Sequence, residues 1–443
     1  MLLDEKWLKS TSKDAVVEET PQSRIFVCIV ALTCMALNQS GLIFGLNLSL
    51  ADPLLIIALL FLMLERRVVL PRHAFIFFLL LTITTIATAL FFTPVRFGTT
   101  INESKIFVDF VKMLTSLAFL TFGYNLAASG LARTAVHWFA TGAAIVAIIG
   151  VTLNLAGIHV FDATMYYHNV RFRGLMIDPN YYAILACAAI AYFVRDRRTP
   201  RPLRIIALLF LGYSIVISGS KTGTVAMLIL AVVLLLEYAI VARRSVALTS
   251  LLLGSAVAVI AAWDAVATFT RGLANQFGYA LPQLTRLAEL FDGSLSAASG
   301  GGSDRVNVWG RGLDIVESSP ILGVGIGSYS AVGEEVSGLG TLAHNTYIQL
   351  AAEWGLPLAA LFILLMIILL VRSSQRAYSQ LDLDALLLRD LLLVLMIGSI
   401  SLSLNNARMF WLFLGMIIFI TSKAPAATPL SFDSKMLQTR AAQ

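Results

Sequence analysis

The chain has 443 residues, of which 58% are hydrophobic and 13% charged, and its mean hydropathy is +0.83. Soluble domains carry about 25% charged residues, so this composition excludes a soluble globular protein and indicates that lipid surrounds most of the exterior. The formal net charge of +6 does not indicate a nucleic-acid partner, because the basic residues lie mostly at the ends of apolar runs and form no dense stripe with aromatic residues. The three cysteines lie inside apolar segments without CxxC spacing, so we expect no disulfide and no zinc site.

The apolar runs predict an all-α, polytopic membrane protein with about twelve transmembrane helices. The expected helices, in chain order, cover residues 25–37, 53–64, 73–92, 105–128, 135–156, 180–194, 203–217, 222–241, 246–268, 346–371, 386–404 and 409–420. With the N-terminus inside and strict alternation, most Lys and Arg residues fall on the side of both termini. The positive-inside rule therefore places both termini in the cytoplasm.

This topology divides the chain into five parts. They are a cytoplasmic tail, helices one to nine, a large periplasmic loop, helices ten to twelve and a second cytoplasmic tail, at residues 1–24, 25–268, 269–345, 346–421 and 422–443. The first tail lacks the basic start and short apolar core of a cleaved signal peptide. We expect the large loop to be partly helical, because apolar residues recur at helical spacing over 306–317, after the flexible stretch 294–302.

Two arginines lie in the outer loop that precedes the sixth helix. Arg171 and Arg173 occur in the string Arg-Phe-Arg-Gly, beside the membrane on the side where cations are not favoured. Arginine can bind phosphate bidentately, so one interpretation is a phosphate or pyrophosphate contact. The other interpretation is a structural arginine paired with Asp162 or Asp178. The spacing alone leaves both open.

The short outer turn Ser-Gly-Ser-Lys-Thr-Gly, at 218–223, connects the seventh and eighth helices. It is not a P-loop, because that motif requires glycine directly before lysine and Ser220 is there. Small residues that expose backbone N–H groups beside Lys221 make an anion site a reasonable hypothesis. The alternative is a tight helical hairpin with a surface lysine.

The large loop contains Arg305, Trp309 and Arg311 within one expected helix. Ser303 or Asp304 can cap this helix, which places Arg305 and Trp309 on one face. An arginine over an aromatic ring can contact a sugar and a phosphate, or the two side chains can stack and stabilise the loop. Both interpretations remain open.

His344 lies where the large loop re-enters the membrane. Asn345, Gln349 and Glu353 then repeat every four residues along one side of the next helix. A polar stripe inside a membrane helix usually faces the protein interior or a water-filled cavity. Histidine titrates near neutrality and can accept a proton from a hydroxyl, so His344 is a candidate general base, with a purely structural histidine as the alternative.

Two further polar groups accompany these loops. Lys105, Asp109 and Lys112 share a face of the fourth helix, and we interpret them as an ion-paired lock between helices. The string Asn-Asn-Ala-Arg at 405–408 caps the outer turn between the last two helices and could join the same site as His344.

The string Gly-Val-Gly-Ile-Gly at 323–327 lacks GxGxxG spacing and opens no βαβ unit, which argues against a dinucleotide site.

Taken in order, these motifs resemble the O-antigen ligase and polysaccharide polymerase superfamily. The resemblance covers about residues 171–357, and it rests on the strings at 171–174, 178–180, 218–223, 303–309, 319–329 and 344–357. It implies glycan transfer, without a metal or other cofactor, on the outer face of the bacterial inner membrane. The donor implied is a glycan on undecaprenyl pyrophosphate.

The resemblance also implies a role for each residue that matches a motif. The loop histidine is the expected base and a loop arginine the expected pyrophosphate ligand, and these are His344 and Arg305. Many members carry arginine at the Ser-Gly-Ser turn, where this chain has Lys221, which keeps the charge and loses the bidentate geometry. The residues expected to bind substrate are Arg171, Arg173, Lys221, Arg311 and Asn345.

Polymerases and ligases of this superfamily share a donor and differ in the acceptor, which is another lipid-linked repeat unit or lipid A-core. We favour a polymerase of exopolysaccharide or O-antigen, by fold-level analogy. The expected partners are the lipid-linked glycan, its acceptor, membrane lipids and, for a polymerase, a chain-length regulator, without nucleic acid. A transporter or flippase is a different class, and it predicts broken helices with ionisable residues near the midplane, whereas here most charges gather at the outer edge.

Overall fold

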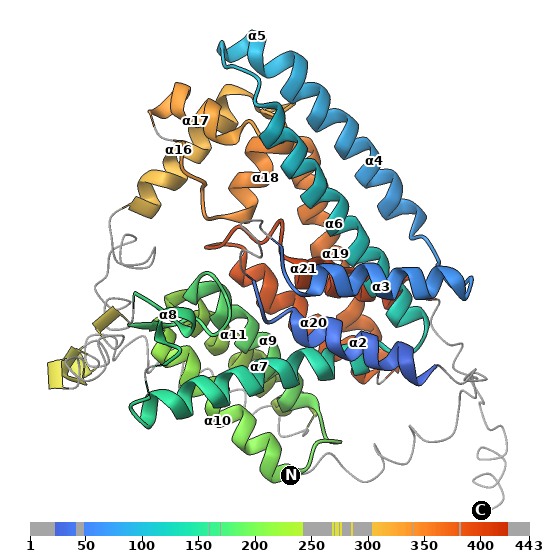
Figure 1. Ribbon diagram of the computed structural model, residues 1–443, viewed down its shortest axis with the longest axis vertical. Coiled ribbons are helices and arrows are strands. Elements are labelled where there is room, and N and C mark those ends of the chain that lie inside the picture. Colours follow the sequence, from blue (N-terminus) through green and yellow to red (C-terminus); the bar gives the residue numbers. More distant parts are fainter. Residues whose placement is uncertain are drawn as a thin grey trace, which may run out of the picture.

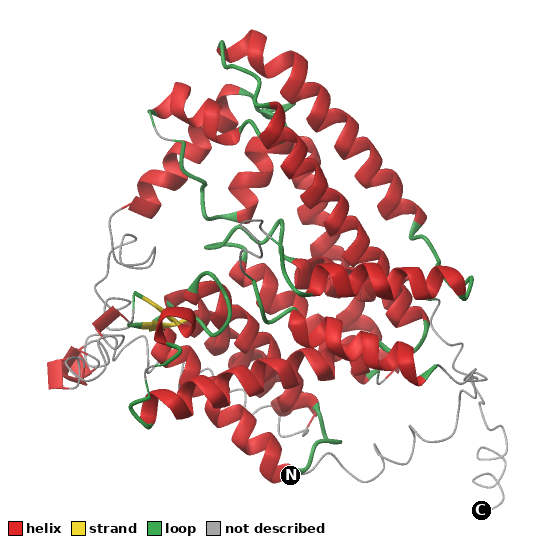
Figure 2. Cartoon of the chain, in the orientation of Figure 1, coloured by secondary structure: helices red, strands yellow, loops and turns green. Residues whose placement is uncertain are grey.

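The computed structural model describes residues 23–40, 48–158, 160–168, 170–241, 304–338, 340–380 and 382–423, together with a few residues between 268 and 286. Over these ranges helices dominate, and the strands form one antiparallel hairpin in which Tyr166 pairs with Phe172 (Figure 2). In chain order the elements are α2 (Arg24–Ala36), α3 (Ala51–Leu64), α4 (Arg72–Ala87), η1 (Thr88–Phe92), α5 (Thr93–Phe97), α6 (Glu103–Ala128), α7 (Ala132–Leu155), α8 (Asp162–Met165), β1 (Tyr166–Tyr167), β2 (Arg171–Phe172), α9 (Pro179–Arg195), α10 (Arg201–Ser218), α11 (Lys221–Val241), α16 (Asp304–Ser318), α17 (Tyr329–Ser337), α18 (Thr346–Trp354), α19 (Leu356–Gln380), α20 (Leu383–Gly398) and α21 (Arg408–Ser422).

These helices confirm the expected fold class, an all-α polytopic membrane protein. In the described part of the chain, five helices are long and apolar enough to cross a membrane, and three shorter helices are also apolar. Each expected helix has a counterpart, except that at 246–268, which lies outside the described residues together with the stretch 294–302.

Two expected helices have a different course in the structure. The third, expected at 73–92, continues through the π-helical turn η1 as far as Phe97. The tenth, expected as one helix over 346–371, is broken at Gly355, which has φ 79° and ψ 159° and separates α18 from α19. Only glycine adopts such angles readily, and the apolar periodicity on both sides concealed the break.

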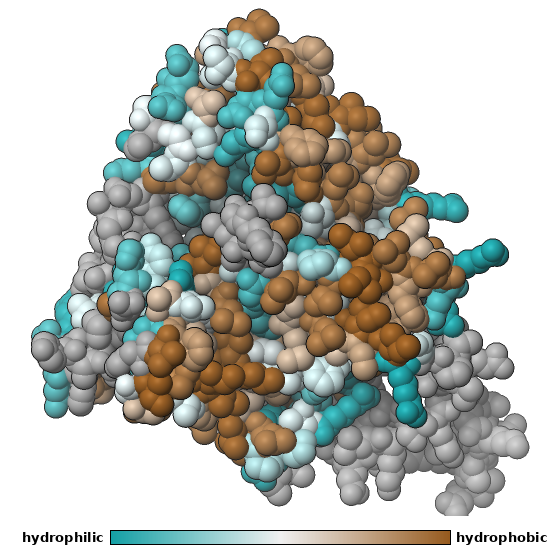
Figure 3. Space-filling model, viewed as in Figure 1, coloured by the Kyte–Doolittle hydropathy of each residue, from teal (hydrophilic) through white to brown (hydrophobic). Residues whose placement is uncertain are grey.

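The helices run between two sides of the molecule. Figure 1 shows α8, the β-hairpin, α16 and α17 at the left of the view and the α3–α4 connection at the right. We call the side of α8, α16 and α17 the loop side, and the other the opposite side. Figure 3 shows hydrophobic residues over α3, α4 and α10, as helices in contact with lipid require, and hydrophilic residues over α17.

A small apolar core fastens the helices of the large loop to the membrane helices. α16 and α17 both pack against α18, and Phe97 at the end of α5 packs against the same core. The buried residues of this core are Ile315, Val316, Val324, Tyr329, Val332, Ala343 and Ala352. The described part of the large loop, 304–338 and 340–345, therefore folds onto the loop-side end of α18.

The glycine-rich string 323–327 runs between the break at Gly355 and the continuous helical rod formed by α4 and η1. The Val324 N–H donates to the carbonyl of Ala352 at 2.8 Å. Ala352 lies in the last turn of α18, so its carbonyl has no partner within the helix and is satisfied by this bond. The Ile326 N–H donates to the carbonyl of Thr85 at 3.3 Å. The string is a structural connector that fixes α17 and α18 against α4.

Candidate active site

Arg171 ties the loop before α9 to the turn between α10 and α11. Its Nε donates to the carbonyl of Ser218 at 2.8 Å, and its Nη2 donates to Asn180 Oδ1 at 3.0 Å. Ser218 is the last residue of α10, so this arginine satisfies a carbonyl that the helix end leaves without an intrahelical partner. The contact places Arg171 beside the turn that carries Lys221.

Lys221 begins α11, and its side chain is only 4% exposed. Ser220 is fully buried, and its Oγ accepts from the Gly223 N–H at 3.1 Å, which closes the turn. A buried ammonium group requires compensating polar groups around it. The turn is therefore a tight hairpin, but its lysine is an interior cation and not the surface lysine of the alternative interpretation.

Thr222 connects this turn to the segment 399–407, which joins α20 to α21. Its Oγ1 shares a short hydrogen bond with Ser401 Oγ. The carbonyl of the next residue, Leu402, accepts from Thr346 Oγ1 at 2.6 Å and from the Thr346 N–H at 3.0 Å. A path of hydrogen bonds and one peptide unit thus joins the lysine turn to the first residue of α18.

His344 lies two residues before Thr346, at this same end of α18. It is exposed, and its φ of 47° lies in the left-handed region, which costs a residue with a side chain about 1–2 kcal/mol. Backbone strain of this kind concentrates at functional sites. Asn345 is buried and caps α18, since its Oδ1 accepts from the N–H groups of Tyr347 at 3.0 Å and Ile348 at 3.1 Å. The cap fixes where the helix begins and presents His344 directly in front of it.

α16 brings Arg311 to the same place. A Cβ on Gly312 would lie 3.4 Å from the Cβ of Ala343, so α16 crosses the chain next to His344. Arg311 Nη1 and Trp309 Nε1 are both buried, and neither has a hydrogen-bond partner among the described residues. Buried donors are normally paired, so these two nitrogen atoms are suited to receive a polar ligand.

The other two predicted arginines are placed differently. Arg305 lies in the first turn of α16, and its side chain is outside the part of the chain that the structure describes. Arg173 donates to the backbone carbonyls of Ala163 at 2.9 Å, Thr164 at 3.1 Å and Ile177 at 3.2 Å. Arg173 therefore shapes its own loop, through carbonyls and not through the nearby carboxylates that the structural interpretation expected.

A polar chamber of about 80 Å³ lies between α6, α17 and α18. Gln349 and Glu353 line it, and Gln349 Nε2 donates to Glu353 Oε1 at 2.9 Å, so the prediction that the polar stripe faces the interior or a cavity is confirmed for these two residues. Asn345, the third residue of the stripe, caps α18 and does not line the chamber. On the opposing wall, Lys112 Nζ lies 2.7 Å from Asp109 Oδ1. This ion pair lies within α6, so the expected lock between helices is wrong for these two residues.

Tyr329 lines the same chamber from α17. Burial, together with the nearby charge of Glu353, raises the pKa of the Tyr329 phenol to about 12. Tyr329 therefore remains a neutral hydrogen-bond donor at physiological pH. No sequence pattern marks Tyr329, because its place in the chamber depends on how the large loop folds.

Only part of the string 405–408 belongs to the chamber. Asn405 and Asn406 line it, and the buried Asn405 Oδ1 has no hydrogen-bond partner in the described part of the chain. Arg408 instead forms a bidentate ion pair with Asp52, in which Nη2 lies 2.6 Å from Oδ2. This pair fastens the start of α21 to the start of α3, so Arg408 has a structural role.

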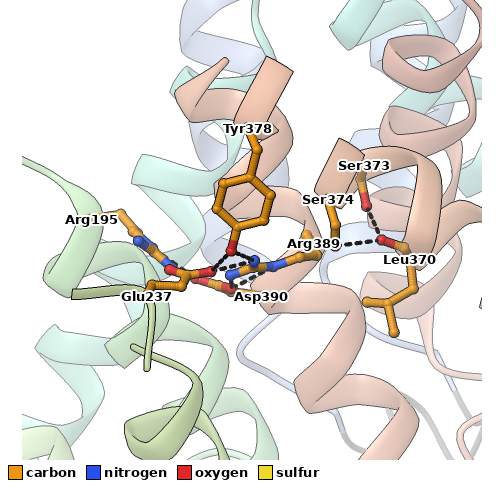
Figure 4. Close-up of polar contacts among 8 residues, drawn as sticks. All are labelled: Arg195, Glu237, Leu370, Ser373, Ser374, Tyr378, Arg389 and Asp390. Carbon is orange, nitrogen blue, oxygen red and sulfur yellow. Dashed lines mark hydrogen bonds and ion pairs between the residues drawn. The ribbon is translucent and has the colours of Figure 1, made fainter. Parts of the chain in front are cut away.

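A second charged cluster lies on the opposite side of the molecule. Figure 4 shows Arg195 of α9, Glu237 of α11, Tyr378 of α19, and Arg389 and Asp390 of α20 in one network. Arg195 Nε donates to Asp390 Oδ2 at 2.8 Å, and the Tyr378 hydroxyl donates to Glu237 Oε1 at 2.6 Å. Two positive and two negative charges balance within it, so we interpret it as a lock between four helices. The expectation that charges gather at the outer edge overlooked this cluster.

Residues 206–363 match the family model of O-antigen ligases. Over this range the chain is similar to O-antigen ligases. The match confirms the resemblance to the O-antigen ligase and polymerase superfamily, and it supports membrane glycan transfer of the ligase or polymerase type. The matched range contains the 218–223 turn, α16 and His344, whereas Arg171 precedes it. No curated protein matches the chain.

Residues 399–404, the first part of the segment 399–407, were not expected to belong to this site. The eleventh helix was expected to run to residue 404, but α20 ends at Gly398. From Ser399 to Asn406 serine and asparagine replace every second apolar residue, which was a signal for that end, and hydropathy averaging over the preceding leucines concealed it. The segment matters because it connects the two halves of the site.

Proposed function

We propose that the protein is a polysaccharide polymerase of the bacterial inner membrane, which joins exopolysaccharide or O-antigen repeat units at the periplasmic face. The proposed donor is a glycan on undecaprenyl pyrophosphate, and the proposed acceptor is a second lipid-linked repeat unit. The observation that carries the proposal is the path from Thr222 through Ser401 and Leu402 to Thr346. The path joins the turn that carries the buried Lys221 to the start of α18, which carries the exposed His344 with its left-handed backbone.

These two groups suit the chemistry of transfer from a pyrophosphate. The hydroxyl oxygen of the acceptor sugar attacks the anomeric carbon of the donor, and a new carbon–oxygen bond forms while the bond from that carbon to the phosphate oxygen breaks. The hydroxyl proton passes to the imidazole of His344, which acts as general base. Undecaprenyl pyrophosphate leaves with the bonding electron pair, and nearby cations stabilise its growing negative charge.

The proposal assigns the predicted residues to separate roles. Arg305, Lys221 and Arg171 supply positive charge to the pyrophosphate, and Arg311 donates to the glycan or its phosphate. Asn345 acts through His344, because its cap on α18 fixes the backbone in front of the helix. Arg173 acts through the shape of the loop that carries Arg171. A good leaving group is already present on the donor, so the step requires no metal ion and no nucleotide.

A second candidate is an O-antigen ligase that transfers the glycan to lipid A-core. The observation in its favour is the family match over 206–363, whose description is O-antigen ligase. Both enzymes use the same donor and the same leaving group, so the site described above serves either reaction. The acceptor separates them, and a chain-length regulator is a partner in the polymerase case alone.

The variant His344→Asn tests the proposed base. Asparagine tolerates a left-handed backbone, so the variant removes the titratable group and keeps the local geometry. We expect transfer by the purified variant to fall by about 10²–10⁴-fold, the usual contribution of a general base, with an unchanged melting temperature.

His168→Asn is the matched control, because His168 is another loop-side histidine with a positive φ, of 51°. This control is expected to retain full activity. Full activity in His344→Asn, or an equal loss in both variants, would contradict the proposed role of His344.

A further inference from the structure

A groove of about 590 Å³ lies between α7, α9 and α10, away from the loop side. Its walls are mostly apolar, and they include Trp138, Ile145 and Ile148 of α7 and Leu203 and Ile206 of α10. None of these residues belongs to the candidate active site. The volume is within the range of about 300–1,000 Å³ that is usual for sites that hold small molecules.

One end of this groove carries charged side chains, two of them arginines. Arg133, at the start of α7, and Arg198, in the α9–α10 connection, both line it. Arg133 Nε is buried and lies 3.4 Å from Asp384 Oδ1 without a hydrogen bond. The carboxylate of Asp196 also faces this end, but it already accepts from the Thr199 hydroxyl and from the backbone N–H groups of Arg198 and Thr199. The guanidinium groups are therefore the donors best placed for an incoming ligand.

The groove has the length of one lipid leaflet. Arg133 and Ile148 both line it, and they lie about 22 Å apart along α7 at a rise of 1.5 Å per residue. A bilayer is about 40–45 Å thick with its headgroup regions, so one leaflet is about 20–22 Å thick. With Arg133 at the level of the headgroups, the apolar end of the groove reaches the middle of the membrane.

We propose that this groove binds an anionic phospholipid from the leaflet on the opposite side. One acyl chain lies along α7 and α10, and the phosphate lies between Arg133 and Arg198. The arginines select this occupant over a zwitterionic lipid, because basic pockets between membrane helices attract anionic headgroups. The inference does not depend on glycan transfer, since the groove and His344 lie on different sides of the molecule.

The test is native mass spectrometry of the full-length protein, released from micelles that contain equal amounts of phosphatidylglycerol and phosphatidylcholine. The wild-type protein is expected to retain phosphatidylglycerol preferentially. The double variant Arg133→Gln/Arg198→Gln is expected to bind it about 25-fold more weakly, from about fivefold for each arginine. The matched control Arg197→Gln/Arg201→Gln removes two exposed arginines that do not line the groove, one in the same connection and one at the start of α10, and it should leave retention unchanged.

A second variant keeps the test valid if loss of Arg133 disturbs folding. Ile145→Trp fills the groove without changing any charge, and it should lower retention of the phospholipid while the melting temperature stays the same. Equal retention of the two lipids by the wild type, or an equal loss in the control double variant, overturns the proposal. Unchanged retention in Ile145→Trp also overturns it, because it places the lipid elsewhere or another segment in the groove.

Discussion

Substitution of Gly325 by alanine tests how the glycine-rich string holds the loop helices against the membrane helices. Gly325 has φ +77°, and a Cβ there would lie 2.5 Å from Ala89 N and from the Thr85 carbonyl oxygen, both in the backbone of the α4–η1 rod. The left-handed backbone costs alanine about 1–2 kcal/mol. Displacement of the string from the rod costs about 1–3 kcal/mol, as in an overpacked core. We therefore expect Gly325→Ala to lower the free energy of unfolding by about 2–5 kcal/mol.

Gly338→Ala is the matched control for this prediction. Gly338 has a similar φ of +72°, but nothing lies within 4 Å of the Cβ position. The control therefore carries the backbone cost alone, about 1–2 kcal/mol. Denaturant titration of both purified variants, followed by tryptophan fluorescence, measures the difference. An equal loss of stability in the two variants would refute the steric part of the reasoning.

Two further predictions concern other parts of the fold. Arg389→Met removes one partner of the buried network in Figure 4, so the free energy of unfolding should fall by about 3–5 kcal/mol in the same titration, and a loss below 1 kcal/mol would show that the network is not a lock. Tyr329 has a pKa of about 12 in the folded protein, above the ordinary value of 10, so its contribution to stability is intact below about pH 10 and is lost as the pH rises toward 12. Over that interval the wild type should lose about 2–3 kcal/mol more than Tyr329→Phe, and parallel curves for the two proteins would contradict the shift.

Hydropathy predicted the helices because contact with lipid demands apolar side chains along the whole of a membrane-spanning helix. It failed at positions where a helix ends and apolar residues continue. Leucine follows Gly355 directly, so the break between α18 and α19 was not visible in the apolar pattern. Beyond Gly398 isoleucine and leucine alternate with serine, so averaged hydropathy carried the expected helix past the end of α20.

The motifs singled out candidate residues for the site, and they could not predict the contacts of those residues. The position of Arg171 depends on a hydrogen bond to the carbonyl of Ser218. Arg408 forms an ion pair with Asp52, which is 356 residues away in the sequence, and not with the groups of the site. Such pairings depend on how the helices pack, which no local pattern encodes. His344 is the exception, because its position directly before the expected helix was predicted from the sequence, and the structure places it in front of α18.

Reconstitution of the purified protein in vesicles with an undecaprenyl-pyrophosphate-linked repeat unit, with and without lipid A-core, tests the central claim most directly. We predict release of undecaprenyl pyrophosphate and a ladder of elongated glycan in the absence of core, and the loss of both in His344→Asn. A single transfer that requires core would identify a ligase and contradict the polymerase. No transfer to either acceptor would contradict glycan transfer by this site altogether.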